Sequence, residues 1–396
     1  MRNKKQMNKL ALQTKLKRLL IAGELAALVA VPLLFSNAGM RKVDAAQGDV
    51  KINSTNFPDE GFRKYISKNI DRNKDGVLSK AEIKKVTEIK LEHYDEAGNE
   101  YVYNDLTGIG VFTELKSLEC ESQKDLSKLD LHKNTKLEFV KCGRNGIKEL
   151  NVSKLTKLKE LRCYVNKLTK LDVSKNVNLE ILDCESNNLT GLDLRKNTKL
   201  VELYCGGNKL TKLDLTKNTK LNNLWCYDNK LTKLDVSKNT KLSRIVCSSN
   251  KLTKLDVTKN LDLVDLYCDT NKLTKLNVDK NEKLIGLVCS DNKLTQLHLT
   301  NNKQLVKLEC AKNQLTQLDT SHNNALVWVV CTNNRLTKLD FSASPLCNSV
   351  VCNENKLTEI IVPKNMENDR IYYDKNLKVS IKKKTKQDLH RLRSPD

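Results

Sequence analysis

The stretch LKELRCYVNKLTKLDVSKNVN, from Leu158 to Asn178, decides the fold, because its pattern returns every 21 residues along most of the chain. Five of its residues recur with the same type in the next repeat, as Leu179, Leu182, Cys184, Asn187 and Leu189. A fixed period of this length predicts a solenoid, in which each repeat stacks on the one before it.

Cysteines keep the register of these repeats, at positions 120, 142, 163, 184, 205, 226, 247, 268, 289, 310, 331 and 352. Within each repeat, LxxLxC is followed by LxxLDV, and apolar residues alternate with polar ones in both segments. This alternation places Leu161, Cys163, Leu171 and Val173 inside, because successive side chains of a strand point to opposite faces. We therefore expect a mainly β repeat solenoid with two parallel β-sheets around a narrow core.

The consensus LxxLxCxxNxLxxLDVSxNxx resembles the leucine-rich repeat superfamily, and within it the 21-residue nested type called IRREKO, which is common in bacterial surface proteins. The resemblance covers roughly residues 106–381, and we assign the solenoid to residues 115–381. It implies a right-handed leucine-rich-repeat solenoid with a binding role, as in internalin-like surface proteins.

The start of the chain has the layout of a signal peptide. Residues 1–18 carry seven Lys or Arg and no acid, and Leu19 to Phe35 is apolar except for Glu24. We expect cleavage near Ala45, so that residues 1–45 are removed and the protein is secreted or extracellular. An uncleaved anchor is the alternative, although the apolar stretch is short for a membrane span. We expect no span in the mature chain.

Residues 46–90 are expected to form a small α-helical cap, with Phe62, Tyr65, Ile66 and Ile70 on the apolar face of its first helix. The next stretch, DRNKDGVLSKAE, has the spacing of a calcium loop, whose ligands would be Asp71, Asn73, Asp75, the Val77 carbonyl, Ser79 and Glu82. It resembles the single EF-hand-like module that precedes leucine-rich repeats in many Gram-positive surface proteins. We expect Ca²⁺ to stiffen the cap; the alternative is that the cap only closes the solenoid end. Residues 91–114 are the connector into the first repeat.

The chain is strongly basic, with a formal net charge of +22. Residues 1–45 hold nine basic and two acidic residues, so the mature chain is near 22 − 7 = +15. Lysines recur at fixed repeat positions, and an aspartate ladder lies beside them, so we expect many of these charges to pair on a solvated outer face. The alternative is a surface for anionic cell-wall polymer, helped by the basic tail of residues 382–396; nucleic acid is the less favoured polymer. The lysines are Lys170, Lys212, Lys233, Lys254, Lys275, Lys175, Lys196, Lys217 and Lys238, and the aspartates are Asp172, Asp193, Asp214, Asp235 and Asp256.

The regular cysteines are expected to be reduced core thiols, because each fills a slot that other leucine-rich repeats give to leucine. The asparagine three residues after each regular cysteine from Cys142 to Cys352, such as Asn166, is expected to satisfy turn backbone groups. Both are scaffold features. The histidines are scattered, with no phosphate loop or nucleophile elbow, so the sequence does not indicate an enzyme.

Function is sought where the repeats differ. The outward position between leucine and cysteine is aromatic or β-branched in five successive repeats, which predicts an exposed apolar stripe that binds a partner. The alternative is that such residues suit any sheet surface. The candidate residues are Tyr204, Trp225, Val246, Tyr267 and Val288, flanked by Tyr227 and Trp328.

The sequence thus favours a secreted or cell-surface binding protein, a monomer in adhesion or in recognition of a protein or glycan. The alternatives are a basic solenoid that binds anionic wall polymer and a passive surface spacer. The chain has no LPxTG wall-sorting signal, so we do not assign its means of retention, and cell-wall association stays an open alternative.

Overall fold

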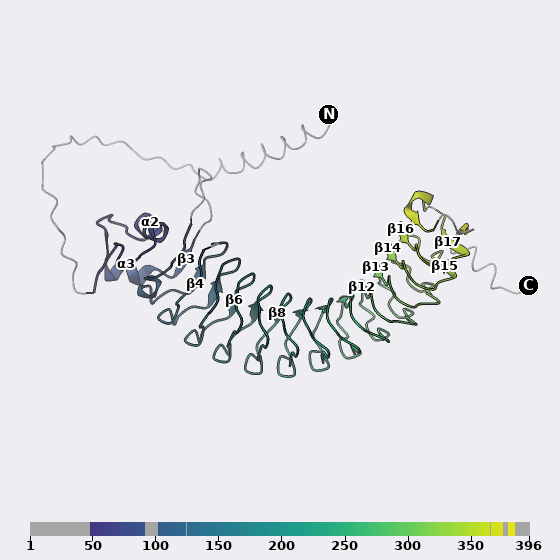
Figure 1. Cartoon of the computed structure of the whole chain (residues 1–396), viewed down its shortest axis with the longest axis horizontal. Helices are drawn as coiled ribbons and strands as arrows, with labels where there is room; N and C mark the ends of the chain where they lie inside the picture. The colour runs from purple at the N-terminus through teal and green to yellow at the C-terminus, as the bar shows by residue number, and fades with distance from the viewer. Residues whose placement is uncertain (1–47, 92–101, 124, 365, 375–378, 385–396) are drawn as a thin grey trace, which may run out of the picture. The chain divides into compact units, whose positions relative to one another are not determined.

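The computed structural model describes residues 48–91, 102–123, 125–364, 366–374 and 379–384. The predicted signal peptide and residues 385–396 of the predicted tail lie outside these ranges. The described residues belong to one compact unit within residues 45–396, and this unit is a parallel-sheet solenoid that begins with a helical cap (Figure 1).

The cap contains two short helices and a pair of antiparallel strands. Its elements are β1 (Val50–Lys51), α2 (Glu60–Asn69), β2 (Val77–Leu78) and α3 (Lys80–Lys85). Asp59 starts α2, since its side chain accepts a hydrogen bond from the Phe62 N–H at 2.7 Å. Ser79 and Glu82 form a capping box at the start of α3. The predicted apolar face is confirmed, because Phe62, Ile66 and Ile70 are buried and Tyr65 packs against them.

The large sheet has 14 parallel strands, and its first strand comes directly from the cap. β3 (Glu88–Lys90) pairs with β4 (Ser117–Glu119), so the cap and the solenoid share one sheet. After the connector, the 3₁₀ helix η1 (Ile109–Val111) leads into the first full repeat. The following strands are β5 (Phe139–Lys141), β6 (Glu160–Arg162), β7 (Ile181–Asp183), β8 (Glu202–Tyr204), β9 (Asn223–Trp225), β10 (Arg244–Val246), β11 (Asp265–Tyr267), β12 (Gly286–Val288), β13 (Lys307–Glu309), β14 (Trp328–Val330), β16 (Ser349–Val351) and β18 (Ile371–Tyr372).

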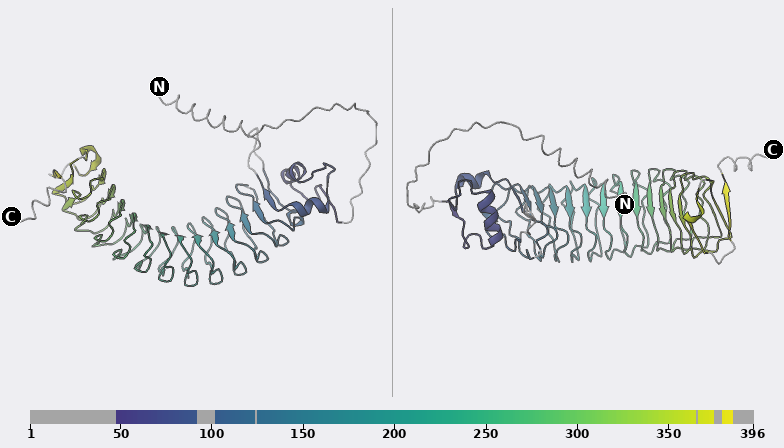
Figure 2. Two further views of the ribbon diagram at one scale, coloured as in Figure 1. Left: turned by 180° about the vertical axis from the view of Figure 1, so that it is seen from behind. Right: turned by 90° about the horizontal axis from the view of Figure 1, so that it is seen from above.

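Strands pair in the register that the period predicts. Leu161 on β6 lies opposite Leu182 on β7, which is 21 residues later, and Figure 2 shows these strands side by side. Residues at equivalent repeat positions therefore form straight columns across the sheet.

The second sheet is shorter than expected. Only β15 (Lys338–Asp340), β17 (Glu359–Pro363) and β19 (Ser380–Lys384) form it among the described residues. In earlier repeats the apolar side chains of the LxxLDV segment are buried, such as Leu168, Leu171 and Val173. Adjacent repeats share a single backbone bond at the start of this segment, such as Lys167 N–H to the Ile147 carbonyl at 2.9 Å. The backbone then turns, because Asp172 Oδ1 accepts from the Ser174 N–H at 2.9 Å. Asp340 of β15 makes the same bond, to the Ser342 N–H at 3.0 Å, so this turn alone does not prevent strand pairing. The neighbouring segment EIIVP of β17 is rich in β-branched residues, which favour a strand.

β19 also changes the assignment of the tail. Lys382 and Lys383, which the sequence placed there, pair with β17 in this strand. The repeat architecture therefore continues to Lys384 within the described residues.

The cysteines lie in the core as predicted. All thirteen are free and buried, and burial raises the pKa of Cys142, Cys226 and Cys310 to about 12. These thiols are thus neutral side chains that fill the space behind the large sheet.

The first asparagine of each repeat also has its predicted role. Asn166 donates to the carbonyls of Cys142 and Cys163 at 2.9 and 3.1 Å, and its Oδ1 accepts from the Ile147 N–H at 3.0 Å. It thereby joins adjacent repeats and satisfies buried backbone groups.

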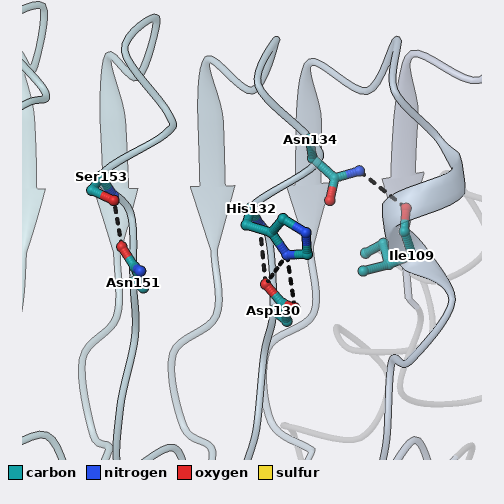
Figure 3. Close-up of polar contacts among 6 residues, drawn as sticks. All are labelled: Ile109, Asp130, His132, Asn134, Asn151 and Ser153. Carbon is teal, nitrogen blue, oxygen red and sulfur yellow. Dashed lines mark hydrogen bonds and ion pairs between the residues drawn. The ribbon is translucent and has the colours of Figure 1, made fainter.

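A second asparagine, which sequence reasoning did not single out, is buried in the opposite turn of most repeats. Asn176 is fully buried and donates to the carbonyls of Val152 and Leu155 at 3.0 and 2.8 Å. Figure 3 shows the equivalent bond in an early repeat, from Asn134 to the Ile109 carbonyl at 3.0 Å. It also shows the turn in which Asn151 accepts from Ser153.

Candidate binding surface

We use the term strand face for the outward-facing side chains of the 14-stranded sheet. The predicted stripe lies on this face as a contiguous column, because the register places Trp225 between Tyr204 and Val246, and Tyr267 beyond Val246. The rings of Tyr204 and Trp225 meet edge to face, with centroids 5.4 Å apart. Such packing holds the rings in place and presents a rigid apolar surface.

The stripe is less exposed than expected. Tyr204, Trp225, Val246 and Tyr267 are half-buried, and Val288 is only 7 % exposed, so its prediction as an exposed contact was wrong. Val288 lies between Tyr267 and Glu309 in register, and a short side chain between two longer ones is covered by them.

Trp328 is exposed, but the structure does not bring it into the stripe. It is 44 % exposed and belongs to β14, three strands beyond Tyr267, in a different column. It lines a separate hollow near the C-terminal end with Val351, Arg370 and Tyr372. Tyr267 instead has Lys307 over its ring, with Nζ 5.6 Å from the centroid.

Acidic side chains beside the stripe were missed by sequence reasoning. β7 ends in Asp183, which is 8 % exposed, and Glu185 follows one residue after the buried Cys184. Desolvation by burial raises the pKa of both carboxyls, and Asp183 adds to the effect on Glu185, whose pKa reaches about 7. The nearest cation is Arg162, whose Nη1 is 3.8 Å from Asp183 Oδ2, while its Nε is bonded to Glu160 at 2.5 Å.

Two tyrosines of the strand face each lie across a glycine toward a glutamate. A Cβ added to Gly206 would lie 2.4 Å from Tyr227 Cε1, and the nearby Tyr227 hydroxyl partly offsets the rise in the pKa of Glu185. The same arrangement occurs three repeats earlier, where Tyr164 lies across Gly143 toward Glu121. The signal was present in the sequence, because glutamate, glycine and tyrosine follow one another twice in the position after the ladder cysteine.

We use the term lysine side for the surface that carries the recurring lysines after LT and before the second asparagine. The predicted pairing of these lysines with the aspartate ladder was wrong. The aspartates accept hydrogen bonds from their own turns, as in Asp214 with Thr216 at 3.0 Å, or pair with a neighbouring arginine, as in Asp193 with Arg195 at 2.7 Å. Among the ion pairs of the described residues, none includes Lys170, Lys212 or Lys233.

The loop between α2 and α3 holds the residues of the predicted calcium site. Asp71 is 4 % exposed; its Oδ2 accepts from the Gly76 N–H at 3.0 Å, and its buried Oδ1 has no hydrogen-bond partner. Glu82 reaches back to the Arg72 N–H at 2.8 Å, which brings the two ends of the loop together. Burial opposes this carboxylate, yet hydrogen bonds from Ser79 and Arg72 hold the pKa of Glu82 below its usual value.

In the loop as it stands, carboxylates bind backbone groups. Gly76 has a φ of +78°, which allows the sharp turn in the middle of the loop. Within the described ranges, no three His, Cys, Asp or Glu side chains are grouped closely enough to hold a metal ion by themselves.

No helix in the same ranges is long and apolar enough to cross a membrane.

The parallel register, the buried leucine and cysteine columns and the asparagine bonds between repeats define a leucine-rich-repeat solenoid. Solved structures of this class resemble the chain. An internalin, InlF, from Listeria monocytogenes has 19% sequence identity and a TM-score of 0.65, covering 85% of this chain and 98% of its own. The LRR protein LIC12759 from Leptospira interrogans has 20% identity and a TM-score of 0.56, covering 83% and 96%.

A third similar structure is the functional domain of InlJ from Listeria monocytogenes, which includes a cysteine ladder. It has 29% identity and a TM-score of 0.49, with 83% of this chain and 85% of that chain covered. No family model matches the chain, and neither does any curated protein.

Proposed function

We propose that the protein is a secreted or cell-surface binding protein that holds a protein or glycan on its strand face. The observation that carries the proposal is the stripe from Tyr204 to Tyr267, because rigid, half-buried aromatic rings provide large contact area at a low entropic cost. The same fold serves ligand binding elsewhere: a plant peptide hormone receptor in complex with RGF2 has 20% identity and a TM-score of 0.59.

An anionic cell-wall polymer is the second candidate, and it would use the lysine side. The observation in its favour is that Lys170, Lys212 and Lys233 are exposed and take no part in the ion pairs of the described residues. Binding of this kind releases counterions and weakens steeply with salt. Salt therefore separates the two candidates.

The test presents the protein to arrays of proteins and glycans and to purified bacterial cell walls, at low and high salt. One variant combines Tyr204→Ala, Trp225→Ala and Tyr267→Ala; a second combines Lys212→Gln, Lys233→Gln and Lys254→Gln. We expect the parent protein to bind its ligand at both salt concentrations. The aromatic variant should have an affinity lower by about 100-fold or more, and the lysine variant should bind like the parent. Binding that disappears with salt and in the lysine variant would instead establish the wall polymer, and no binding by any form would leave a passive spacer.

We also propose that the cap loop binds Ca²⁺. The residues that would hold it are Asp71, Asn73, Asp75, the Val77 carbonyl, Ser79 and Glu82, and the unpartnered buried Oδ1 of Asp71 supports the fit. A hard cation there would replace the internal bonds of the loop with oxygen ligation and so stiffen the cap. The loop follows α2, so its order affects the end of the sheet that begins at β3.

Calcium binding is measured by thermal unfolding in excess Ca²⁺ and in chelator. At a Ca²⁺ concentration of 100 times Kd, linkage raises the free energy of unfolding by about 2.7 kcal/mol. Asp75→Asn should remove most of this difference, whereas Asp369→Asn, far along the chain, should leave it unchanged. Equal unfolding temperatures of the parent protein in Ca²⁺ and in chelator would refute the proposal.

A further inference from the structure

The strand face has the opposite charge to the rest of this basic chain. In the columns of β4 to β11, its bases are Lys141, Arg162 and Arg244, and its acids are Glu119, Glu121, Glu160, Asp183, Glu185, Glu202, Asp265 and Asp269. The acids outnumber the bases in a protein with a net charge of +22. This part of the surface would therefore attract a positively charged partner, while the lysine side repels it.

The charge is concentrated around β7. Asp183 and Glu185 lie on the same side of the sheet because they flank one inward-pointing residue, Cys184. Arg162 lies 3.8 Å from Asp183, but it also binds Glu160. Two carboxylates and one shared guanidinium leave negative charge uncompensated in a half-buried place, where charge interactions are stronger than in open solvent.

Aromatic rings stand on the next two strands. Tyr204 follows Asp183 in register, Trp225 follows Tyr204, and Tyr227 lies over Gly206 against Glu185. The Tyr204 hydroxyl donates to Glu202 at 2.8 Å, which fixes the orientation of that ring. A carboxylate beside fixed aromatic rings is the environment that attracts a desolvated cation.

Two polar atoms at this place are buried without a hydrogen-bond partner, Glu185 Oε1 and Trp225 Nε1. Glu185 Oε1 accepts hydrogen bonds, so an N–H donor of a cationic partner would satisfy it, whereas the Trp225 Nε1–H is itself a donor and gains no partner in this way. Both lie beside the half-exposed rings of Tyr204 and Tyr227, so the stripe and the acids form one continuous surface.

We propose that Asp183, Glu185, Tyr204, Trp225 and Tyr227 form a subsite for a cationic side chain, arginine or lysine, of a protein partner. This inference rests on the proposed binding function and specifies the partner as a protein with a basic contact. A neutral or anionic glycan would leave the two carboxylates without compensation. Arginine fits best, because its planar guanidinium can both bond a carboxylate and stack on a ring.

The test uses Trp225 as its reporter. Only two tryptophans are present, so a Trp328→Phe background leaves Trp225 as the sole indole. The probes are the peptide acetyl-(Arg-Gly)₄-amide and its counterpart with citrulline, which has the same shape as arginine but no charge. At pH 8, we expect a saturable change in Trp225 fluorescence with the arginine peptide and binding at least about tenfold weaker with citrulline.

Variants then locate the binding. Glu185→Gln and Asp183→Asn keep the shape of each side chain, and each should lower the affinity for the arginine peptide by about tenfold. Glu309→Gln, on the same face but paired with Lys307 at 2.9 Å, is the matched control and should bind like the parent. Circular dichroism and urea unfolding confirm that each variant is folded.

Equal binding of the two peptides, no fluorescence change up to millimolar peptide, or an unchanged affinity in both acid variants would overturn the inference. It can fail while the proposed function survives. In that case the aromatic triple variant loses its array ligand, but Glu185→Gln keeps it. If the triple variant also keeps its ligand, the stripe itself is not the binding surface.

Discussion

The strand face and the lysine side come from the same 21-residue repeat, yet they differ in almost every physical property. On the strand face, side chains in one column touch their neighbours on adjacent strands, as Tyr204 and Trp225 do at 5.4 Å. On the lysine side, polar groups bond within their own turn, as Asp214 and Thr216 do. The comparison teaches that surface side chains of adjacent repeats pack on one another on the strand face, whereas the aspartates of the lysine side bond within their own turn, although buried asparagines join the repeats on both sides.

The largest expected difference concerns the two buried asparagines. Asn229, in the turn after a strand, bonds three carbonyls and accepts from the Leu210 N–H at 2.9 Å. Asn229→Ala leaves that buried donor unsatisfied and should lower the free energy of unfolding by about 3 kcal/mol or more. Asn239, in the opposite turn, bonds two carbonyls and accepts from no group in the described chain, so Asn239→Ala should cost about 2 kcal/mol.

Urea unfolding of both variants measures this difference. Equal losses would mean that the two turns are equally coupled to the neighbouring repeats, and the contrast between the sides would not extend to their scaffold.

Two glycine substitutions, one on each side, should change the free energy of unfolding by an intermediate amount. Gly206→Ala places a Cβ 2.4 Å from Tyr227 Cε1 and must displace that ring, whereas a Cβ at Gly191, on the lysine side, meets nothing within 4 Å. We expect Gly206→Ala to destabilise by about 1–2 kcal/mol. Gly191→Ala should be neutral or stabilise by a few tenths of a kcal/mol, up to about 1. Thermal unfolding checks the pair, and a neutral Gly206→Ala would show that the ring is free to move.

The smallest expected effects are in the pH dependence, and their signs are opposite. The pKa of Glu185 rises to about 7 because of burial and Asp183, so folding retains a proton that the unfolded chain has released. Stability contributed by this group therefore falls as pH rises from about 4.5 to 7. Glu185→Gln should stabilise the protein by about 1 kcal/mol at pH 8, because the folded protein no longer has to ionise a partly buried carboxyl and solvent screens part of that cost. At pH 4 the substitution should be neutral.

On the lysine side, the Arg195 side chain lowers the pKa of Asp193 to about 2. Its contribution is present above the usual aspartate pKa and is lost as pH falls toward 2. Asp193→Asn should therefore destabilise slightly at pH 7 and have no effect below pH 2. Unfolding at several pH values measures both variants, and a change of the same sign in both would contradict the assignment.

The sequence predicted the scaffold well and the surface less well. The 21-residue period identified the buried cysteines and the bonding role of Asn166, because these follow from one repeat stacked on an identical one. It also placed Tyr204 beside Trp225. The second sheet was overestimated, since alternation in LxxLDV indicates which side chains are buried but not whether adjacent repeats pair as strands there.

The acidic part of the candidate site depended on tertiary structure. The succession of Glu185, Gly206 and Tyr227 in adjacent repeats is visible in the sequence, but the burial of Glu185 and the position of the Tyr227 ring across Gly206 are set by the tertiary structure. Val165 is a similar case on the backbone, because a β-branched residue does not prefer its φ of +49°, yet stacking and Asn166 hold it there.

By itself, the sequence determined which residues share a column, because a constant period converts a separation of 21 residues into a neighbouring strand. Only the tertiary structure decided how deeply each column is buried, which carboxylates are paired and which polar atoms are left without a partner. Those properties depend on side chains of different size and charge that meet across repeats, and a repeat pattern describes only what the repeats have in common.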